Sequence, residues 1–124
     1  MSPRQSKPIY LEIAERIASE IMLGVYKEGD RIPSVRDTAA QMEVNANTAM
    51  RSYAALEGEG ILESRRGLGY FVAKGAEKSI LRARRRDFSD VVAPEFFRAM
   101  DALGYTTADI VRMYAEYKKT KETK

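Results

Sequence analysis

The sequence predicts a mostly helical protein with one small β-hairpin, organised as an N-terminal domain over residues 1–75 and a shorter helical segment over residues 76–124. Three observations predict this class. Apolar residues recur at the spacing of amphipathic helices in stretches on both sides of the hairpin. Residues 61–73 instead form two short β-prone runs separated by glycines. Lys74-Gly75 then marks a joint, after which the helical pattern resumes.

Length and composition exclude many classes of function. The 124 residues amount to about one average domain, and 44% hydrophobic with 31% charged residues is typical of a soluble globule. The chain has no cysteine and no histidine, which excludes disulfides, Cys/His zinc sites, thiol nucleophiles and His-based catalytic triads. We therefore expect neither an enzyme nor a cofactor or metal site.

The sequence gives no sign of membrane insertion or export. No apolar run approaches the ~20 residues that span a bilayer. Residues 1–7 lack the hydrophobic stretch of a signal peptide. We expect a cytoplasmic protein without a membrane partner.

The net charge of +3 is distributed unevenly along the chain. Residues 1–75 carry ten basic and ten acidic residues, so the excess lies beyond Gly75, with a dense run at Arg82, Arg84, Arg85 and Arg86. Arginines at this spacing spread around a helix axis, and we expect this run to be a solvated helix surface. The net charge alone therefore does not show whether the protein binds a polyanion. The evidence must come from where the charges lie on each helix or strand.

The first helix is predicted from Ile9. Pro8 suits its first turn and Gly24 suits its end. A turn and a very short strand at Arg31-Ile32 follow, before Pro33 disfavours helix in the residue preceding it. The buried face of this helix is predicted from apolar residues at every fourth position: Ile9, Ile13, Ile17 and Ile21.

Two further helices with a tight break between them are predicted next. Ser34 is a suitable N-cap for a helix of about two turns, and Asn45 for a longer helix that ends near Glu59. Glu43-Val44 forms the break. On the longer helix, the spacing predicts one buried face and one polar face. The buried face comprises Ala46, Ala49, Met50, Tyr53 and Leu56, and the polar face comprises Asn47, Thr48, Arg51 and Ser52.

The hairpin completes a recognisable order of elements. Strands are predicted at Ile61–Arg65 and Tyr70–Ala73, joined by a turn that contains Gly67 and Gly69. Helix, short strand, helix, tight turn, helix and hairpin is the order of a winged helix-turn-helix, with residues 1–75 as its DNA-binding domain.

The remaining residues are predicted to form a short C-terminal helical dimerisation segment. Helices are expected over about Ala76–Phe88, from Pro94, and from Thr106 with Asp109 in capping-box position, followed by a polar tail over 118–124. A segment this small does not bury a stable core alone, so we expect a second chain to cover it in a homodimer. The alternative is that these helices fold back on their own winged domain. The apolar stripes concerned are Phe96, Phe97, Met100 and Leu103, and Ile110, Tyr114 and Tyr117.

Several separated motifs resemble the DNA-binding domain of the GntR family of bacterial transcription regulators. They agree in order and spacing over about residues 8–73, and the Asn-x-Asn-Thr motif with the small C-terminal segment is similar to the YtrA subfamily in particular. The resemblance implies a dimeric, sequence-specific regulator of double-stranded DNA, commonly a repressor of ABC-transporter operons. The motifs are Pro8-Ile9-Tyr10, Gly29–Arg36, Val44–Glu57, Gly60–Leu62 and Gly67–Val72.

Two residues depart from the family pattern. Glu43 stands where relatives usually have glycine, and a left-handed backbone there costs ~1 kcal/mol. Ala46 stands where relatives commonly have arginine or proline, so an arginine contact at that position is absent. The operator sequence of other family members therefore cannot be assumed for this protein.

The third helix is the predicted reading element. The major groove of B-DNA accepts a helix, and residues near the helix N-terminus contact base edges. We expect Asn45, Asn47, Thr48 and Arg51 to fill these roles, with asparagine pairing to adenine and arginine to guanine or phosphate. Asn45 could instead serve only as a cap, and Arg51 as a solvated surface charge.

The second helix and the hairpin are predicted to grip the backbone and the minor groove. Ser34 and Arg36 form a phosphate clamp at a helix N-terminus, a role that the family's matching residues have. Arg66 is expected to enter the ~6 Å wide minor groove, supported by Arg65 at a phosphate, while Gly67 permits the turn and a close approach. Ser34 could be only a cap, Arg36 only a surface charge, and Gly67 only a turn residue.

The leading interpretation is a homodimeric DNA-binding repressor whose half-sites lie ~10 bp apart. A winged helix can also act as a protein interaction module without specific DNA binding. RNA binding fits less well, because single strands favour exposed aromatic platforms. No sequence pattern identifies a small-molecule effector, although a small apolar pocket between the helices of residues 76–124 could hold one.

Overall fold

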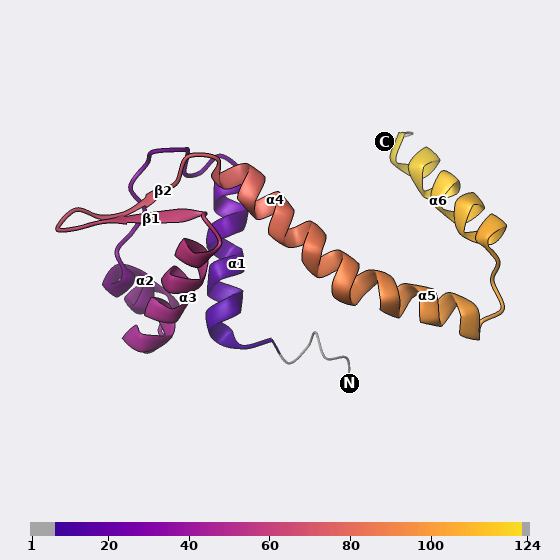
Figure 1. The fold of residues 1–124 in the computed structure, drawn as a ribbon, viewed down its shortest axis with the longest axis horizontal. Coiled ribbons are helices and arrows are strands. Elements are labelled where there is room, and N and C mark those ends of the chain that lie inside the picture. Colours follow the sequence, from indigo (N-terminus) through magenta and orange to yellow (C-terminus); the bar gives the residue numbers. More distant parts are fainter. Residues whose placement is uncertain (1–6, 123–124) are drawn as a thin grey trace. The chain divides into compact units, whose positions relative to one another are not determined.

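The computed structural model describes residues 7–122, which form two compact units that divide between Arg84 and Arg85 (Figure 1). The division falls inside helix α4 (Ala76–Asp87), beyond Gly75, where the sequence placed the joint. The reason is that Ala76 and Ile80 are buried in the core of the first unit. Among the described residues, none of the helices is long and apolar enough to cross a membrane.

The first unit has the predicted winged helix-turn-helix order. It contains α1 (Ile9–Met22), α2 (Val35–Met42), α3 (Ala46–Gly58), β1 (Leu62–Arg65), β2 (Gly69–Val72) and the start of α4. Both α1 and α2 pack against α3, and the β1–β2 hairpin projects away from the helices (Figure 1). The prediction of a mostly helical fold with one hairpin is confirmed.

Helix α1 supplies one wall of the core. Ile13, Ile17 and Ile21 are buried as the spacing predicts, whereas Ile9 in the first turn is exposed. Arg84 of α4 donates to the Ser19 hydroxyl at 2.9 Å and contacts a Glu15 carboxylate oxygen at 2.7 Å. These contacts fasten α4, at a residue in its C-terminal half, to α1.

The helix-turn-helix is held by the predicted caps. The Asp37 N–H donates to Ser34 Oγ at 3.0 Å, and the Asn47 N–H donates to Asn45 Oδ1 at 2.7 Å. Between the helices, Glu43 adopts the left-handed conformation with φ 55° and ψ 47°. This geometry turns the chain sharply from α2 into α3.

Replacing Glu43 with glycine is expected to stabilise the protein. An L-residue in the left-handed region costs roughly 1–2 kcal/mol, and glycine removes this cost but adds freedom to the unfolded chain. We expect the Glu43→Gly free energy of unfolding to rise by up to about 1 kcal/mol in urea titrations. Gln41→Gly, inside α2, is the matched control and should lose stability. A stability loss in Glu43→Gly would contradict the assignment of strain to this residue.

The hairpin is antiparallel, with Leu62 paired to Val72 and Arg65 paired to Gly69. The short strand predicted at Arg31-Ile32 is an isolated bridge from Arg31 to Phe71, reinforced by the Ile32 N–H donating to the Tyr70 carbonyl at 3.0 Å. A Cβ at Gly69, where φ is +109°, would lie 3.0 Å from Arg31 Nε. The positive φ favours glycine at this position, because residues with a Cβ rarely adopt it, while the flexible Arg31 side chain could move away from an added Cβ.

The second unit comprises the end of α4, a π-helix η2 (Phe88–Val92), α5 (Ala93–Ala102) and α6 (Thr107–Glu122). The sequence predicted a helix opened or kinked at Pro94, and Pro94 lies in the first turn of α5, directly after the π-helix. Helix α6 continues through the predicted polar tail as far as Glu122, because its lysines and glutamates are good helix formers. The last two residues of that tail lie outside the described residues.

The second unit buries little of its own apolar surface. Met100 is its one buried hydrophobic residue within 85–121, while Tyr114 on α6 is 61% exposed. An open apolar groove of about 720 Å³ runs between the π-helix, α5 and α6. It is lined by Phe88, Phe96, Ile110, Val111, Met113, Tyr114 and Ala115.

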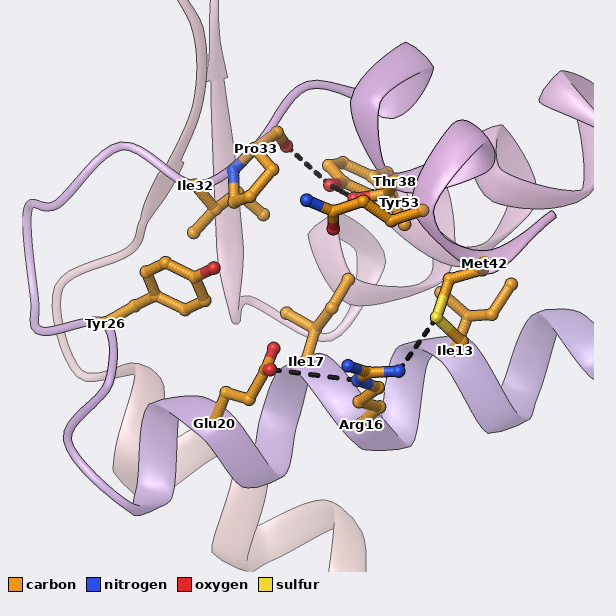
Figure 2. Close-up of a pocket in the computed structure, with 11 residues that line it drawn as sticks. Ile13, Arg16, Ile17, Glu20, Tyr26, Ile32, Pro33, Thr38, Met42 and Tyr53 are labelled. Atoms are coloured by element: carbon orange, nitrogen blue, oxygen red, sulfur yellow. Dashed lines mark hydrogen bonds and ion pairs between the residues drawn. The ribbon is translucent and has the colours of Figure 1, made fainter. Parts of the chain in front are cut away.

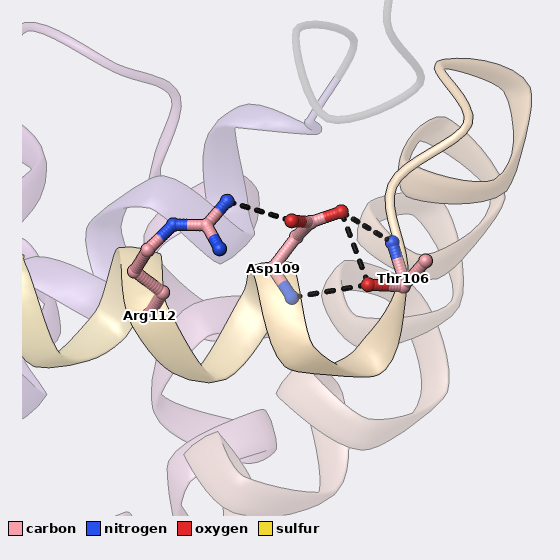
Figure 3. Close-up of polar contacts among 3 residues, drawn as sticks. All are labelled: Thr106, Asp109 and Arg112. Atoms are coloured by element: carbon pink, nitrogen blue, oxygen red, sulfur yellow. Dashed lines mark hydrogen bonds and ion pairs between the residues drawn. The ribbon is translucent and has the colours of Figure 1, made fainter.

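Helix α6 starts in the predicted capping box (Figure 3). The Thr106 N–H donates to Asp109 Oδ2 at 2.8 Å, and the Asp109 N–H donates to Thr106 Oγ1 at 3.2 Å. Arg112 adds a charge-assisted hydrogen bond to Asp109 Oδ1 at 2.6 Å. These contacts satisfy backbone groups that an uncapped helix end would leave unpaired.

The capping box predicts an acid-sensitive helix end. The Thr106 N–H, then the Arg112 and Thr106 side chains, hold the pKa of Asp109 below its ordinary value. A lowered folded pKa means that this contribution to stability is present at neutral pH and is lost as pH falls below about 4. We expect an NMR titration to place the Asp109 midpoint below that of the unfolded chain, and Arg112→Gln to raise it. A midpoint at or above the unfolded value would refute the assignment.

Candidate nucleic-acid interface

The face that α3 turns outward differs in part from the predicted one. Asn47 and Arg51 are exposed as expected, but Ser52 is fully buried and Met50 is 46% exposed. Ala46 is also exposed, so its assignment and that of Met50 to the buried face were wrong. Ser52 is tolerated inside because its hydroxyl donates to the Tyr10 carbonyl at 2.7 Å, with the Thr48 carbonyl as a second acceptor within reach at 3.2 Å. A small satisfied hydroxyl therefore occupies the interface with α1, and the helix is rotated to place Met50 outside.

Tyr53 ties α3 to the start of α2 (Figure 2). Its buried hydroxyl donates to the Pro33 carbonyl at 2.5 Å. The phenol has one proton, so the Thr38 hydroxyl at 2.7 Å is the donor to the Tyr53 oxygen. Burial raises the pKa of Tyr53, which keeps this donor protonated. The ring also meets Tyr70 of β2 edge-on at 5.0 Å between centroids, so one side chain connects α3, the α2 cap and the wing.

A small cavity lies beside this network, between α1 and α2 (Figure 2). It is lined by Ile13, Ile17 and Thr38, and Arg16 at its rim contacts Met42 Sδ at 3.0 Å. Its volume is about 40 Å³. Pockets for small organic ligands measure roughly 300–1,000 Å³, so this cavity is much smaller than such a pocket.

Arg51 is held in place by a residue that the sequence analysis did not assign to the site. Its guanidinium carbon lies 4.1 Å from the centre of the Tyr10 ring. Stacking uses the flat face of the guanidinium and leaves the N–H edges pointing outward in its plane. Tyr10 is carried on the first turn of α1, and the Pro8-Ile9-Tyr10 motif was the sequence signal that could have indicated it.

The wing presents its basic residues at the hairpin tip. Arg66 and Gly67 are exposed in the turn between β1 and β2, and Gly67 has φ +75°. Arg65 stacks on Phe71 at 4.2 Å and lies 3.7 Å from a Glu63 carboxylate oxygen. Arg65 is thus restrained on the strand, whereas Arg66 extends from the tip.

The predicted clamp lies at the start of α2. Ser34 is half-buried and its oxygen accepts the Asp37 N–H, so its own hydroxyl proton can still be donated outward. Arg36 is exposed in the first turn of the helix. This geometry combines a capped helix N-terminus with an adjacent cation, as binding of a phosphate requires.

All nine predicted site residues belong to the first unit, and the structure places them on three consecutive elements. Thr48 and Ser34 are half-buried, and the other seven are exposed. No acidic residue occurs between Asn45 and Leu56, so the first three turns of α3 present only neutral and basic groups outward, and the one acidic side chain of α3, Glu57, lies in its last turn, where its carboxylate accepts the Ser64 hydroxyl at 2.7 Å. The nine are Ser34, Arg36, Asn45, Asn47, Thr48, Arg51, Arg65, Arg66 and Gly67.

Comparison with known proteins decides the family. The family model for bacterial regulatory proteins of the gntR family matches residues 9–72, the part of the chain from the start of α1 to the end of β2. The chain belongs to the GntR family. This GntR member is therefore a DNA-binding transcription regulator and not an enzyme, and the prediction from the sequence motifs is confirmed.

The similarity of this GntR protein to its relatives extends over more residues than the family match at 9–72. It is 39% identical to the transcriptional regulator YhcF of Bacillus subtilis over 87% of this chain and 88% of the relative. It is 36% identical to the transcriptional repressor YtrA of the same organism, over 68% of this chain and 65% of the relative. A GntR-family crystal structure from Bacteroides thetaiotaomicron superimposes with a TM-score of 0.82 at 42% identity, covering 92% of this chain and 99% of that one.

Proposed function

We propose that the protein is a cytoplasmic, homodimeric repressor that binds a pseudo-palindromic operator with α3 in the major groove and the wing in the minor groove. The observation that carries this proposal is the exposed N-terminal part of α3, which presents Asn47 and Arg51 without an acidic neighbour, in the same unit as the exposed basic hairpin tip. A helix of this kind fits the major groove, and the slender Arg66 tip fits the narrower minor groove.

Each side chain has a role that follows from its chemistry. Asn47 reads a base edge, and Asn45 does so from its position as the α3 cap. Arg51, restrained by Tyr10, donates to a guanine or a phosphate, with Thr48 donating nearby. Ser34 and Arg36 hold one phosphate from α2, while Arg65 holds another beside the wing. These contacts set the register of the protein on the duplex.

The exposed apolar surface of the second unit is the reason for proposing a dimer. An exposed apolar patch of this kind is rarely left open to water in a soluble protein. A second copy of the same chain offers a self-complementary surface, which closes in a two-fold dimer. Two recognition helices related in this way would read half-sites ~10 bp apart. The repressor assignment follows the relative YtrA, which carries that name.

Fluorescence anisotropy with selected genomic fragments tests the proposal. We expect affinity for a selected operator to exceed that for a scrambled duplex by about 10³-fold or more and to fall steeply with salt. Genome-wide selection of bound fragments supplies the operator and its half-site spacing together. Equal affinity for operator and scrambled DNA would favour the alternative, a winged-helix interaction module.

Arg66→Ala tests the wing. We expect a loss of operator affinity of about fivefold or more, confined to duplexes with A·T-rich flanks, because a narrow minor groove attracts arginine. Arg82→Ala is the matched control, since it removes the same charge from an exposed position on α4. If Arg66→Ala and Arg82→Ala bind all flanks equally well, the wing has no part in recognition.

A further inference from the structure

We infer that Met50 is a specificity-determining residue that reads the C5-methyl group of a thymine in the operator. Its side chain is 46% exposed on the outward face of α3, one residue before Arg51. Ala46 and Ala54, one turn before and one turn after it, are exposed on the same side of the helix. The inference rests on the proposed function, since it assigns a base to a side chain within the same interface.

The burial pattern separates Met50 from the core residues of α3. Tyr53 is fully buried, and Leu56 and Ala49 are buried with it. Met50 is not part of that core cluster and leaves nearly half of its surface open to water. An apolar side chain in this position gains free energy only when a surface covers it.

The surroundings of Met50 indicate which surface that is. The Tyr70 hydroxyl of β2 lies 3.9 Å from Met50 Sδ, which restrains the chain between the recognition helix and the wing. Asn47, about one turn before Met50, and Arg51, the next residue, are also exposed on α3, and both are hydrogen-bonding groups suited to DNA. An apolar protein partner would have to bury both of these polar groups without matching them, which is costly.

Base chemistry then identifies the contact. Methionine offers no useful hydrogen bond to a base edge, so it cannot read guanine, adenine or cytosine in the major groove. Thymine alone among the four standard bases presents a methyl group there. The short side chains of Ala46 and Ala54 let the helix approach the groove closely enough for Met50 to cover that methyl. The flexible thioether adapts to the shape of the contact.

Removal of a single methyl group from the DNA is the direct test. In the selected operator, each thymine is replaced in turn by uracil, which keeps every hydrogen-bonding group and lacks only the C5-methyl. We expect one thymine per half-site to lose about fourfold in affinity on replacement, the value for one buried methylene-sized group. Replacing it in both half-sites should cost about 15-fold, since the two contacts add.

The protein variants decide whether Met50 is responsible. Met50→Ala should bind thymine and uracil operators equally, and Met50→Leu should retain part of the discrimination. Leu23→Ala, at an exposed apolar residue beyond the end of α1, is the matched control and should discriminate as the native protein does. Alanine is a good helix former at an exposed position, so Met50→Ala is expected to keep the native unfolding midpoint.

The outcomes separate this inference from the proposed function. Selective operator binding with no uracil effect at any thymine overturns the inference alone. Discrimination that persists in Met50→Ala does the same. Failure of the native protein to distinguish operator from scrambled DNA overturns the proposed function, and the inference with it.

Discussion

Tyr114→Glu is expected to leave the protein monomeric and to weaken operator binding by about 100-fold or more. Tyr114 is 61% exposed in the isolated chain and lines the apolar groove with Phe88 and Phe96. In the proposed dimer a second copy covers it, so glutamate would place an unpaired carboxylate in a buried apolar interface. Such a charge costs several kcal/mol, and each ~1.4 kcal/mol is tenfold in affinity. Light scattering at micromolar concentration gives the mass, and anisotropy gives the operator affinity.

Lys119→Glu is the control for this substitution. It introduces the same carboxylate into α6 on the side away from Tyr114 and should leave the dimer intact. A dimeric Tyr114→Glu protein would place the interface elsewhere. A monomeric native protein would instead favour the alternative in which the C-terminal helices fold back on their own winged domain.

Arg51→Ala is expected to weaken operator binding by about 5- to 150-fold, the range that corresponds to ~1–3 kcal/mol for a residue that reads a base. The guanidinium is already stacked on Tyr10, so part of its conformational freedom is lost before DNA arrives. Restraint of this kind raises affinity without adding a contact. Tyr10→Leu should therefore lower operator affinity a few-fold, although Tyr10 itself touches no base. This estimate follows from the value of an exposed cation–π contact, ~0.5–1 kcal/mol.

A double-mutant cycle shows whether the two residues act as one unit. We expect Tyr10→Leu to have no further effect in an Arg51→Ala background, because the group that it positions is gone. Additive losses would mean that Tyr10 contacts DNA independently. The pattern across operators separates the roles of Arg51: relaxed specificity at one position indicates a base, whereas uniform weakening with a salt slope reduced by about one indicates a phosphate.

Much of the site could be predicted because its signals are local. The caps at Ser34 and Asn45 act on amides two or three residues away, and the structure has both hydrogen bonds. The exposed Arg66-Gly67 tip follows from the turn between two short strands. The hydrophobic periodicity of α3 predicted its buried face less well, because the apolar Met50 is exposed and the polar Ser52 is buried.

The sequence alone determined the order of the elements, the ends of the helices in the first unit and the family to which the chain belongs. These depend on residues close together along the chain and on a motif that spans 9–72. The tertiary structure decided which side of α3 faces outward, since the buried Ser52 hydroxyl has its nearest acceptor in the Tyr10 carbonyl, 42 positions earlier. It also decided that α4 begins within the first core, where Ala76 and Ile80 are buried. A polar residue can be buried when a residue distant in the sequence supplies its hydrogen-bond partner, so its polarity alone does not determine whether it is exposed.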